Sequence, residues 1–335
     1  MRDNPSALSG EDRLIANVFK PLASHPGALA LEDDAAFFSP PAGHDLVVTK
    51  DALVAGVHFF PDDPADAIAR KALRVNLSDL AAKGADPAGF LLAIALPAEM
   101  EIAWLEEFAR ALGEDAIHYA CPLMGGDTVR TPGPLTLAVT AFATVPSGMM
   151  VRRRGAQPGD RIFVSGTIGD AALGLRLRKG EGASTRLDVG AAAKHHLLDR
   201  YLLPQPRNAL AHALRDHASA AMDVSDGLVG DLAKLCRVSQ VSADLRVAAV
   251  PLSEAAGAAL ALDKSLIENV LTGGDDYEVL CTVRESKLAA WSAAARQAGV
   301  AVTEIGQVID GEQPPRWLDE GGRALSFAQG AFSHF

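Results

Sequence analysis

The sequence is poor in cysteine and in positive charge. It holds 3 cysteines in 335 residues, Cys121, Cys236 and Cys281, and no two of them form a Cys-x-x-Cys pair. This spacing excludes a disulfide framework or a zinc site and is typical of reduced, cytoplasmic proteins. The 31 Lys and Arg residues are outnumbered by 42 Asp and Glu, so the net charge is −11. An acidic balance argues against nucleic acid as a partner, because such a surface needs clustered positive charge.

Long apolar runs are also lacking. The longest, such as residues 90–96, are far too short to cross a bilayer, which excludes a membrane-spanning helix. The first residues contain no apolar signal core, so we expect a cytoplasmic protein. Hydrophobic residues still make up 49% of the chain, which is enough for a large core, and the length suggests about two domains.

Several common catalytic motifs are missing. The sequence has no P-loop, no Gly-x-Gly-x-x-Gly that opens a helix, no Gly-x-Ser-x-Gly and no His-Glu-x-x-His. A nucleotide site, if one exists, is therefore neither a P-loop nor a Rossmann pocket. The nine histidines are scattered; only His195 and His196 are adjacent, and we expect both on the surface.

Apolar periodicity predicts a mixed α/β fold. Strands are predicted at residues 45–49, 88–96, 135–145, 161–165, 243–247 and 277–283. Helices are predicted at residues 67–83, 101–112, 171–177, 191–198 and 228–238, with a mobile loop at 180–184. Proline, glycine and an arginine run mark a boundary near residues 146–155, which predicts domains of 1–148 and 149–335.

Aspartates recur just after apolar runs and beside Gly, Ser or Thr. A single Asp-Gly at a strand end usually forms only a turn. The repetition favours ligand binding, because residues at strand ends project into the crevice where sheet proteins hold ligands. The set comprises Asp33, Asp34, Asp51, Asp79, Asp127, Asp223, Asp226, Asp275 and Asp276.

If several of these carboxylates converge, they need cations between them. Two like charges about 4 Å apart repel by roughly 4 kcal/mol at an effective dielectric constant near 20. Oxygen ligands without paired His or Cys favour Mg²⁺ or Mn²⁺. Because Mg²⁺ usually bridges carboxylates to substrate phosphates, the pattern predicts phosphate chemistry.

Individual residues leave alternatives open. Asp79 shares a helix face with Asn76 and Lys83, which indicates either a solvated stripe or a ligand that Asn76 orients. His58, beside two phenylalanines, is more often a core histidine than a catalyst. The run at residues 152–154 is either solvated or clamps a phosphate.

Taken together and in order, the motifs resemble those of the thiamine-monophosphate kinases, a family of the aminoimidazole-ribotide-synthetase-like ATP-binding superfamily. The matching segments lie at residues 32–36, 49–59, 71–85, 125–128, 155–160, 223–228 and 273–278, with an aromatic-x-His-Phe end at 332–335. The resemblance implies a two-domain α/β (α+β) PurM-like fold. Its N-terminal half would supply strands to a β-barrel at a homodimer interface, and its C-terminal half an α/β layer.

The resemblance also implies an activity, the ATP-dependent phosphorylation of thiamine monophosphate with Mg²⁺. It assigns catalytic roles to Asp51, Asp79 and Asp127. The implied metal ligands are Asp34, Thr49, Asp51, Asp79, Asp127, Asp223 and Asp226. The implied ATP contacts are Gly126, Asp127, Arg153 and Ser225, and the implied substrate contacts are His58, Asp275 and Phe332.

Three positions depart from the pattern of this family. Glu32 stands where Gly is usual, Lys50 where Thr is usual, and Asp275 where Glu is common. Three other activities stay open on the sequence. They are another ATP-dependent synthetase or kinase of the superfamily, a nucleotide- and metal-binding scaffold without turnover, and a phosphate-monoester hydrolase.

Overall fold

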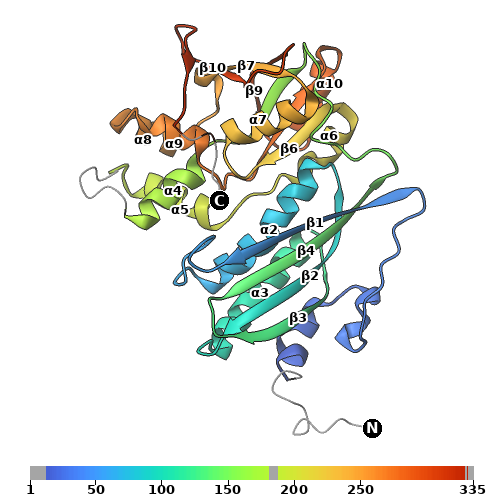
Figure 1. Ribbon diagram of the computed structural model, residues 1–335. Helices are drawn as coiled ribbons and strands as arrows, with labels where there is room; N and C mark the ends of the chain where they lie inside the picture. Colours follow the sequence, from blue (N-terminus) through green and yellow to red (C-terminus); the bar gives the residue numbers. More distant parts are fainter. Residues whose placement is uncertain (1–12, 181–187, 329, 331–335) are drawn as a thin grey trace. The chain divides into compact units, whose positions relative to one another are not determined.

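The computed structural model describes residues 13–180, 188–328 and 330, which fall into two compact units (Figure 1). The first unit comprises the described residues up to Leu80 together with Asp86–Gly148. The second comprises Ala81–Ala85 together with the described residues from Met149 onward. The domain bounds of 1–148 and 149–335 stay a prediction, and the expected loop at 180–184 lies mostly outside the described residues.

A four-stranded sheet and two long helices make up most of the first unit. The strands are β1 (His44–Val54), β2 (Asp86–Pro97), β3 (Leu123–Thr131) and β4 (Thr136–Pro146), and the helices are α2 (Ala65–Ala82) and α3 (Ile102–His118). Short helical turns η1 (Ile15–Phe19), η2 (Lys20–Leu22) and η3 (Pro26–Leu31) precede them. The strand order is β1-β4-β2-β3, with β3 parallel to β2 and the other pairs antiparallel.

The two faces of this sheet differ in what covers them. Every second residue of β4 is buried, because successive side chains of a strand point to opposite faces. Helices α2 and α3 lie against the buried face (Figure 1). The opposite face is open and carries large exposed apolar side chains, namely Leu46, Val48, Leu91 and Val129.

The second unit is a seven-stranded sheet of order β11-β10-β7-β9-β5-β8-β6. Its strands are β5 (Arg161–Ser165), β6 (Ala218–Val224), β7 (Ser242–Arg246), β8 (Glu278–Val283), β9 (Val302–Ile309), β10 (Arg316–Leu318) and β11 (Ala324–Leu325). Its helices are α4 (Asp170–Lys179), α5 (Ala191–Leu202), α6 (Ala211–His217), α7 (Leu228–Ser239), α8 (Glu254–Leu262), α9 (Leu266–Thr272) and α10 (Leu288–Gln297).

Apolar cores form on both faces of the second sheet. Ile162 and Val164 of β5 pack into one core with residues of α4, α5, α7, α8 and α9. Phe163, between them, packs into the other core, where Trp291 of α10 and Leu214 of α6 are buried. Strand β5 is therefore a continuous apolar run, as expected for a strand covered on both faces.

Most of the elements predicted from periodicity are confirmed. The helix predicted at 67–83 is α2, and Gly84 follows it with a φ of +67°, as the end of a helix favours. Strand β3 was not predicted, because its Gly-Gly-Asp-Thr sequence is typical of a turn. Across the described residues, no helix is long and apolar enough to span a membrane.

Candidate active site

Strand β1 and helix α2 bring three of the predicted metal ligands together. The Thr49 hydroxyl donates a hydrogen bond to Oδ2 of Asp79 at 2.5 Å. The backbone N–H of Asp51 donates to Oδ1 of Asn76 at 3.1 Å. Periodicity explains these two contacts. Thr49 and Asp51 are two residues apart and share one face of β1, and Asn76 and Asp79 are three residues apart and share one face of α2. We call Thr49, Asp51 and Asp79 the β1 group.

Asn76 is the residue that fixes this junction. Its side chain is completely buried, and its Nδ2 donates to the carbonyl oxygen of Ala72 at 3.1 Å. The interpretation of this helix face as a solvated stripe is therefore wrong. Lys83, the third member of that stripe, donates instead to the carbonyl oxygen of Ala221 at 2.8 Å, within the second unit.

A second group lies at strand β3. A cavity of about 520 Å³ is lined there by Asp33, Asp34, Gly126 and Asp127, together with apolar side chains that include Leu92. A Cβ on Gly126 would lie 2.0 Å from the Leu92 carbonyl oxygen, so only glycine fits this close approach of two strands. The cavity thus joins three predicted site residues, Asp34, Gly126 and Asp127, which we call the β3 group.

The two groups lie on opposite edge strands of the sheet. Strand pairing aligns Asp51 with Val139 of β4, Leu92 of β2 and Gly126 of β3. Three strand spacings of about 4.8 Å separate the ends of this row by about 14 Å. Asp127 lies one residue further along β3, so strand alternation turns its side chain to the face opposite Asp51.

The expectation that these aspartates follow strand ends is wrong for two of them. Asp51 lies inside β1, which continues to Val54, and Asp127 lies inside β3, which continues to Thr131. The pleat of the strand, and not a turn, sets the direction of each carboxylate. Asp223 does fit the expectation, because it is the penultimate residue of β6.

His58 lies in the loop that follows β1. Its Nδ1 accepts a hydrogen bond from the backbone N–H of Val54 at 3.0 Å. Because Nδ1 is the acceptor, the neutral ring carries its proton on Nε2. The His58 side chain is half-buried.

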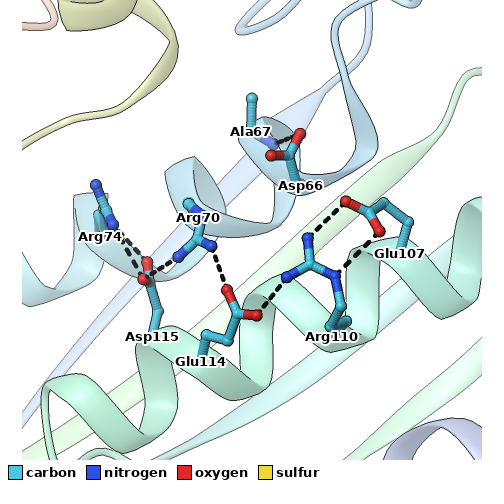
Figure 2. Close-up of polar contacts among 8 residues, drawn as sticks. All are labelled: Asp66, Ala67, Arg70, Arg74, Glu107, Arg110, Glu114 and Asp115. Carbon is cyan, nitrogen blue, oxygen red and sulfur yellow. Dashed lines mark hydrogen bonds and ion pairs between the residues drawn. The ribbon is translucent and has the colours of Figure 1, made fainter.

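A charged network fixes α2, which carries Asn76 and Asp79, to α3 (Figure 2). Asp115 of α3 is almost fully buried and accepts hydrogen bonds from Arg70 at 2.6 Å and from Arg74 at 2.6 and 3.0 Å. Arg70 also contacts Glu114, which in turn pairs with Arg110 on the surface. The helix that positions the β1 group is thus held by buried charge as well as by apolar packing.

In the second unit, three predicted site residues lie at the end of β6 and in the loop that follows it. Asp223 is buried, whereas Ser225 and Asp226 are partly exposed. The backbone N–H groups of Ser225 and Asp226 donate to Oδ2 of Asp231 at 3.0 and 2.9 Å. Burial raises the pKa of Asp231, against the hydrogen bond from Lys234.

The loop that carries Asp275 lies directly beside it. The N–H of Asp275 donates to the Ser225 carbonyl oxygen at 2.9 Å, and that of Tyr277 to the Val224 carbonyl oxygen at 2.8 Å. Asp275 and Tyr277 have positive φ values of +73° and +51°, which non-glycine residues rarely adopt. The fold therefore links the predicted nucleotide loop and the predicted substrate loop through their backbones.

Asp276 anchors that loop from inside. Its Oδ2 accepts the N–H of Gly169 at 2.8 Å, at the start of α4. Burial raises the pKa of Asp276 well above its usual value, and the nearby Asp170 and Glu278 raise it further. Asp276 thus fixes the loop that carries Asp275 to the start of α4.

Some residues at these loops escaped prediction from the sequence. Lys234 forms an ion pair with both Asp226 and Asp231. The sequence signal for this pair was Asp231, an acid in the first turn of α7 directly after the Gly-containing loop. His196 was expected only on the surface, but its Nε2 lies 3.1 Å from Oδ2 of buried Asp170. That pair depends on tertiary contacts between α4 and α5.

Two predicted site residues remain, Arg153 and Phe332. Arg153 is exposed, and its backbone carbonyl accepts a hydrogen bond from Ser239 at 3.2 Å. Phe332 lies outside the described residues. Of the departures from the family pattern, Glu32 pairs with Lys20, while Lys50 is exposed on the open face of the sheet. Lys50 therefore does not pair with the β1 group, which alternates with it along the strand.

The predicted metal ligands are divided between the two units. Within the described ranges, no three His, Cys, Asp or Glu side chains gather closely enough to hold a metal ion by themselves. The donors present are carboxylate and hydroxyl oxygens, which suit Mg²⁺.

Comparison with known proteins places this arrangement in a family. The model of the AIR synthase related protein N-terminal domain matches residues 32–145, and that of the C-terminal domain matches residues 157–315. A thiamine-monophosphate kinase of Caulobacter vibrioides is 45% identical over 302 residues, which cover 89% of this chain and 84% of that protein.

Solved structures give the same result. The crystal structure of thiamine-monophosphate kinase from Stenotrophomonas maltophilia K279a matches with a TM-score of 0.77 and 40% identity, over 88% of this chain and 91% of that chain. AaThiL complexed with AMPPCP and TMP matches with a TM-score of 0.77 and 29% identity, over 90% and 91%. The chain therefore belongs to the thiamine-monophosphate kinase family of the AIR synthase related proteins.

Proposed function

We propose that this protein transfers the γ-phosphoryl group of ATP to thiamine monophosphate, giving thiamine diphosphate and ADP. The observation that carries the proposal is the 45% identity, over 89% of the chain, to a thiamine-monophosphate kinase. AaThiL, which binds AMPPCP and TMP, has the same fold over 90% of this chain. ATP is thus the phosphoryl donor and thiamine monophosphate the acceptor.

Mg²⁺ would be held by oxygen ligands. The donor set is Asp34, Thr49, Asp51, Asp79, Asp127, Asp223 and Asp226. It fits the ion because every donor is a hard oxygen, and because Thr49 and Asp79 already lie within 2.5 Å of each other. When bound, the ion neutralises the charge of the facing phosphates.

The chain itself needs no strong general base. The nucleophile is a phosphate oxygen of the substrate, which is ionised near neutral pH, so the reaction depends on positioning and charge. The catalytic carboxylates are Asp51, Asp79 and Asp127. Direct in-line transfer then requires donor and acceptor to be held in one orientation.

Both substrates are oriented by residues of the loops and strand edges. Gly126, Asp127, Arg153 and Ser225 contact ATP, and the guanidinium of Arg153 binds its phosphates. His58 contacts thiamine monophosphate, and the hydrogen bond from the Val54 N–H to its Nδ1 fixes the orientation of its ring. Asp275 and Phe332 contact the thiamine end of the same substrate.

The working form is a homodimer in the cytoplasm. The open face of the first sheet exposes Leu46, Val48, Leu91 and Val129, so a barrel with a second copy would bury them. Barrel closure also removes both sheet edges, bringing the β3 edge of one copy beside the β1 edge of the other. This pairing would bring the strands that carry the β1 and β3 groups, which lie about 14 Å apart within one sheet, next to each other.

Incubation of the purified protein with ATP, Mg²⁺ and thiamine monophosphate tests the reaction. We expect thiamine diphosphate and ADP in equal amounts. Binding of ATP without either product would favour a scaffold, and release of phosphate without ATP would favour a hydrolase. ADP release only with other phosphorylated small molecules would assign the chain to another activity of the superfamily.

A further inference from the structure

The loop of residues 224–227 is fixed at four backbone atoms. The N–H groups of Ser225 and Asp226 donate to Asp231, while the carbonyl oxygens of Val224 and Ser225 accept from the neighbouring loop. Gly227 completes the turn at a φ of +116°, where a Cβ would lie 2.4 Å from the Thr272 carbonyl oxygen. The backbone of the loop is therefore rigid, and the direction of its side chains is set separately.

Lys234 sets the direction of the Asp226 side chain. Its ammonium contacts Oδ2 of Asp226 and, at 2.9 Å, Oδ1 of Asp231. The Asp231 side chain is completely buried, whereas that of Asp226 is 41% exposed. Lys234 thus joins a buried acid, which holds the loop backbone, to an accessible acid at the loop surface.

We propose that Lys234 is a positioning residue that holds Oδ2 of Asp226 and leaves Oδ1 to bind a divalent cation. The inference rests on the proposed function in one respect, because it takes Asp226 as a metal ligand. Balancing the charge of Asp231 does not by itself require contact with Asp226, since Asp231 also accepts two N–H groups. The ammonium of Lys234 contacts both acids, so Lys234, Asp226 and Asp231 together carry one net negative charge. That charge lies at the exposed Asp226, where a cation has access.

Matched variants separate this role from simple charge balance. Lys234→Met keeps the apolar stem and loses the ammonium, while Lys234→Arg keeps the charge and the donors. Binding of Mn²⁺ to the full-length protein without nucleotide, followed by electron paramagnetic resonance, gives the readout. The ion at Asp226 is identified as the one that is lost in Asp226→Asn.

We expect Lys234→Met to weaken binding of that Mn²⁺ ion about tenfold or more, because loss of a partner that orients a metal ligand typically costs 10–100-fold in affinity. Lys234→Arg should bind Mn²⁺ close to the wild-type affinity. In turnover, Lys234→Met should require more Mg²⁺ while its KM for thiamine monophosphate stays unchanged. Wild-type Mn²⁺ affinity in Lys234→Met would overturn the proposal and leave Lys234 as a counter-ion of Asp231.

A double variant covers the case in which Lys234→Met fails to fold. Asp231→Asn with Lys234→Met removes both charges, so no buried acid is left unbalanced. Weak Mn²⁺ binding in this variant supports the proposal, and wild-type binding overturns it. Unchanged Mn²⁺ binding in Asp226→Asn would also overturn it, whereas product formation by the wild-type protein tests the proposed reaction independently.

Discussion

At the scale of single residues, two contacts between strand β1 and helix α2 hold the β1 group. Thr49 is bound to Asp79, and the backbone of Asp51 is bound to Asn76. These contacts hold the Asp79 carboxylate and the Asp51 backbone in place before any ligand binds, which lowers the cost of ordering them on binding. Asp79, which accepts the hydrogen bond from Thr49, is the residue whose substitution tests the group.

Asp79→Asn should reduce kcat by a factor on the order of 100, because a metal ligand is lost while the shape of the side chain is kept. The measurement is steady-state formation of thiamine diphosphate, with circular dichroism to verify the fold. Asp310→Asn is the matched control, since Asp310 is exposed directly after β9 and is not one of the proposed site residues. Near-full activity in Asp79→Asn would contradict the role of this carboxylate.

Asp276 leads to a prediction about pH. Burial raises its pKa well above the usual 3.8, with Asp170 and Glu278 adding to the shift. His196 pairs with that Asp170 and Arg207 with that Glu278, and both pairs belong to the same packed region. The folded state therefore keeps this proton to higher pH than the unfolded state does. Its contribution to stability is complete below pH 3.8 and is lost as the pH rises through the raised pKa.

Asp276→Asn should remove this dependence. The free energy of unfolding of the wild-type protein should fall with pH by up to about 1.4 kcal/mol per unit above the unfolded pKa of this group, and less steeply in the variant. Urea unfolding of both proteins at a series of pH values measures the two slopes. Identical slopes would mean that Asp276 is ionised in the folded state.

At the scale of elements, α2 is the part of the first unit whose position affects the site most. It is bound to β1 through Asn76 and to α3 through Arg70 and Arg74, which share the buried Asp115 (Figure 2). Removing one partner of a buried ion pair leaves charge without compensation. The network therefore predicts unequal effects of substitutions along α3.

Asp115→Asn should lower the free energy of unfolding by about 3 kcal/mol, since Arg70 and Arg74 would lose their shared carboxylate. Glu107→Gln is the control on the same helix, because Glu107 pairs with Arg110 at the exposed surface and should change stability little. Denaturant titration followed by tryptophan fluorescence compares the two. Equal stability of the two variants would show that the buried pairs contribute nothing.

The element scale also shows what could be predicted from the sequence. The helix over residues 67–83 was recognisable because apolar residues recur with its period, and burial of that face is the main source of its stability. Strand β3 was not recognisable, since Gly125, Gly126 and Asp127 all disfavour strands. Its backbone is extended because it pairs with β2, a contact between residues more than thirty positions apart.

At the scale of the whole molecule, the open face of the first sheet is the feature that a single chain leaves exposed. Val48 is 57% exposed at the centre of β1. We therefore expect Val48→Asp to convert the proposed dimer to a monomer and to abolish turnover, because the β1 and β3 groups would stay apart. Leu262→Asp, a control on the second unit, should leave the dimer intact. Sedimentation velocity measures both, and a monomeric but fully active Val48→Asp protein would contradict the shared site.

The three cysteines provide a prediction about global unfolding. All are buried free thiols, and burial raises the pKa of Cys121 and of Cys236 to about 12 and that of Cys281 further. Thiol reagents react with the thiolate, so the folded protein should react slowly at neutral pH. The measurement is the rate at which a thiol reagent modifies the cysteines, in native buffer and in denaturant. Fast reaction of one thiol in native buffer would mean local opening around it.

The sequence by itself determined the family, the alternation of elements and the chemistry of the site. These depend on residue identity and on short-range periodicity, which local propensities and spacing express directly. The recurring aspartates predicted phosphate chemistry with Mg²⁺, and the resemblance of the ordered motifs to a known family implied phosphoryl transfer from ATP.

Only the tertiary structure decided which of these residues meet. Thr49 and Asp79, thirty positions apart, are joined because α2 packs on the sheet. Strand order placed Asp51 and Asp127 on opposite edge strands of the sheet. The ammonium of Lys234 binds the buried Asp231 and Asp226 together. The physical reason is that a strand pairing or a buried ion pair is favourable only when segments distant in the sequence come together and exclude water. Local propensity does not predict which distant segments meet.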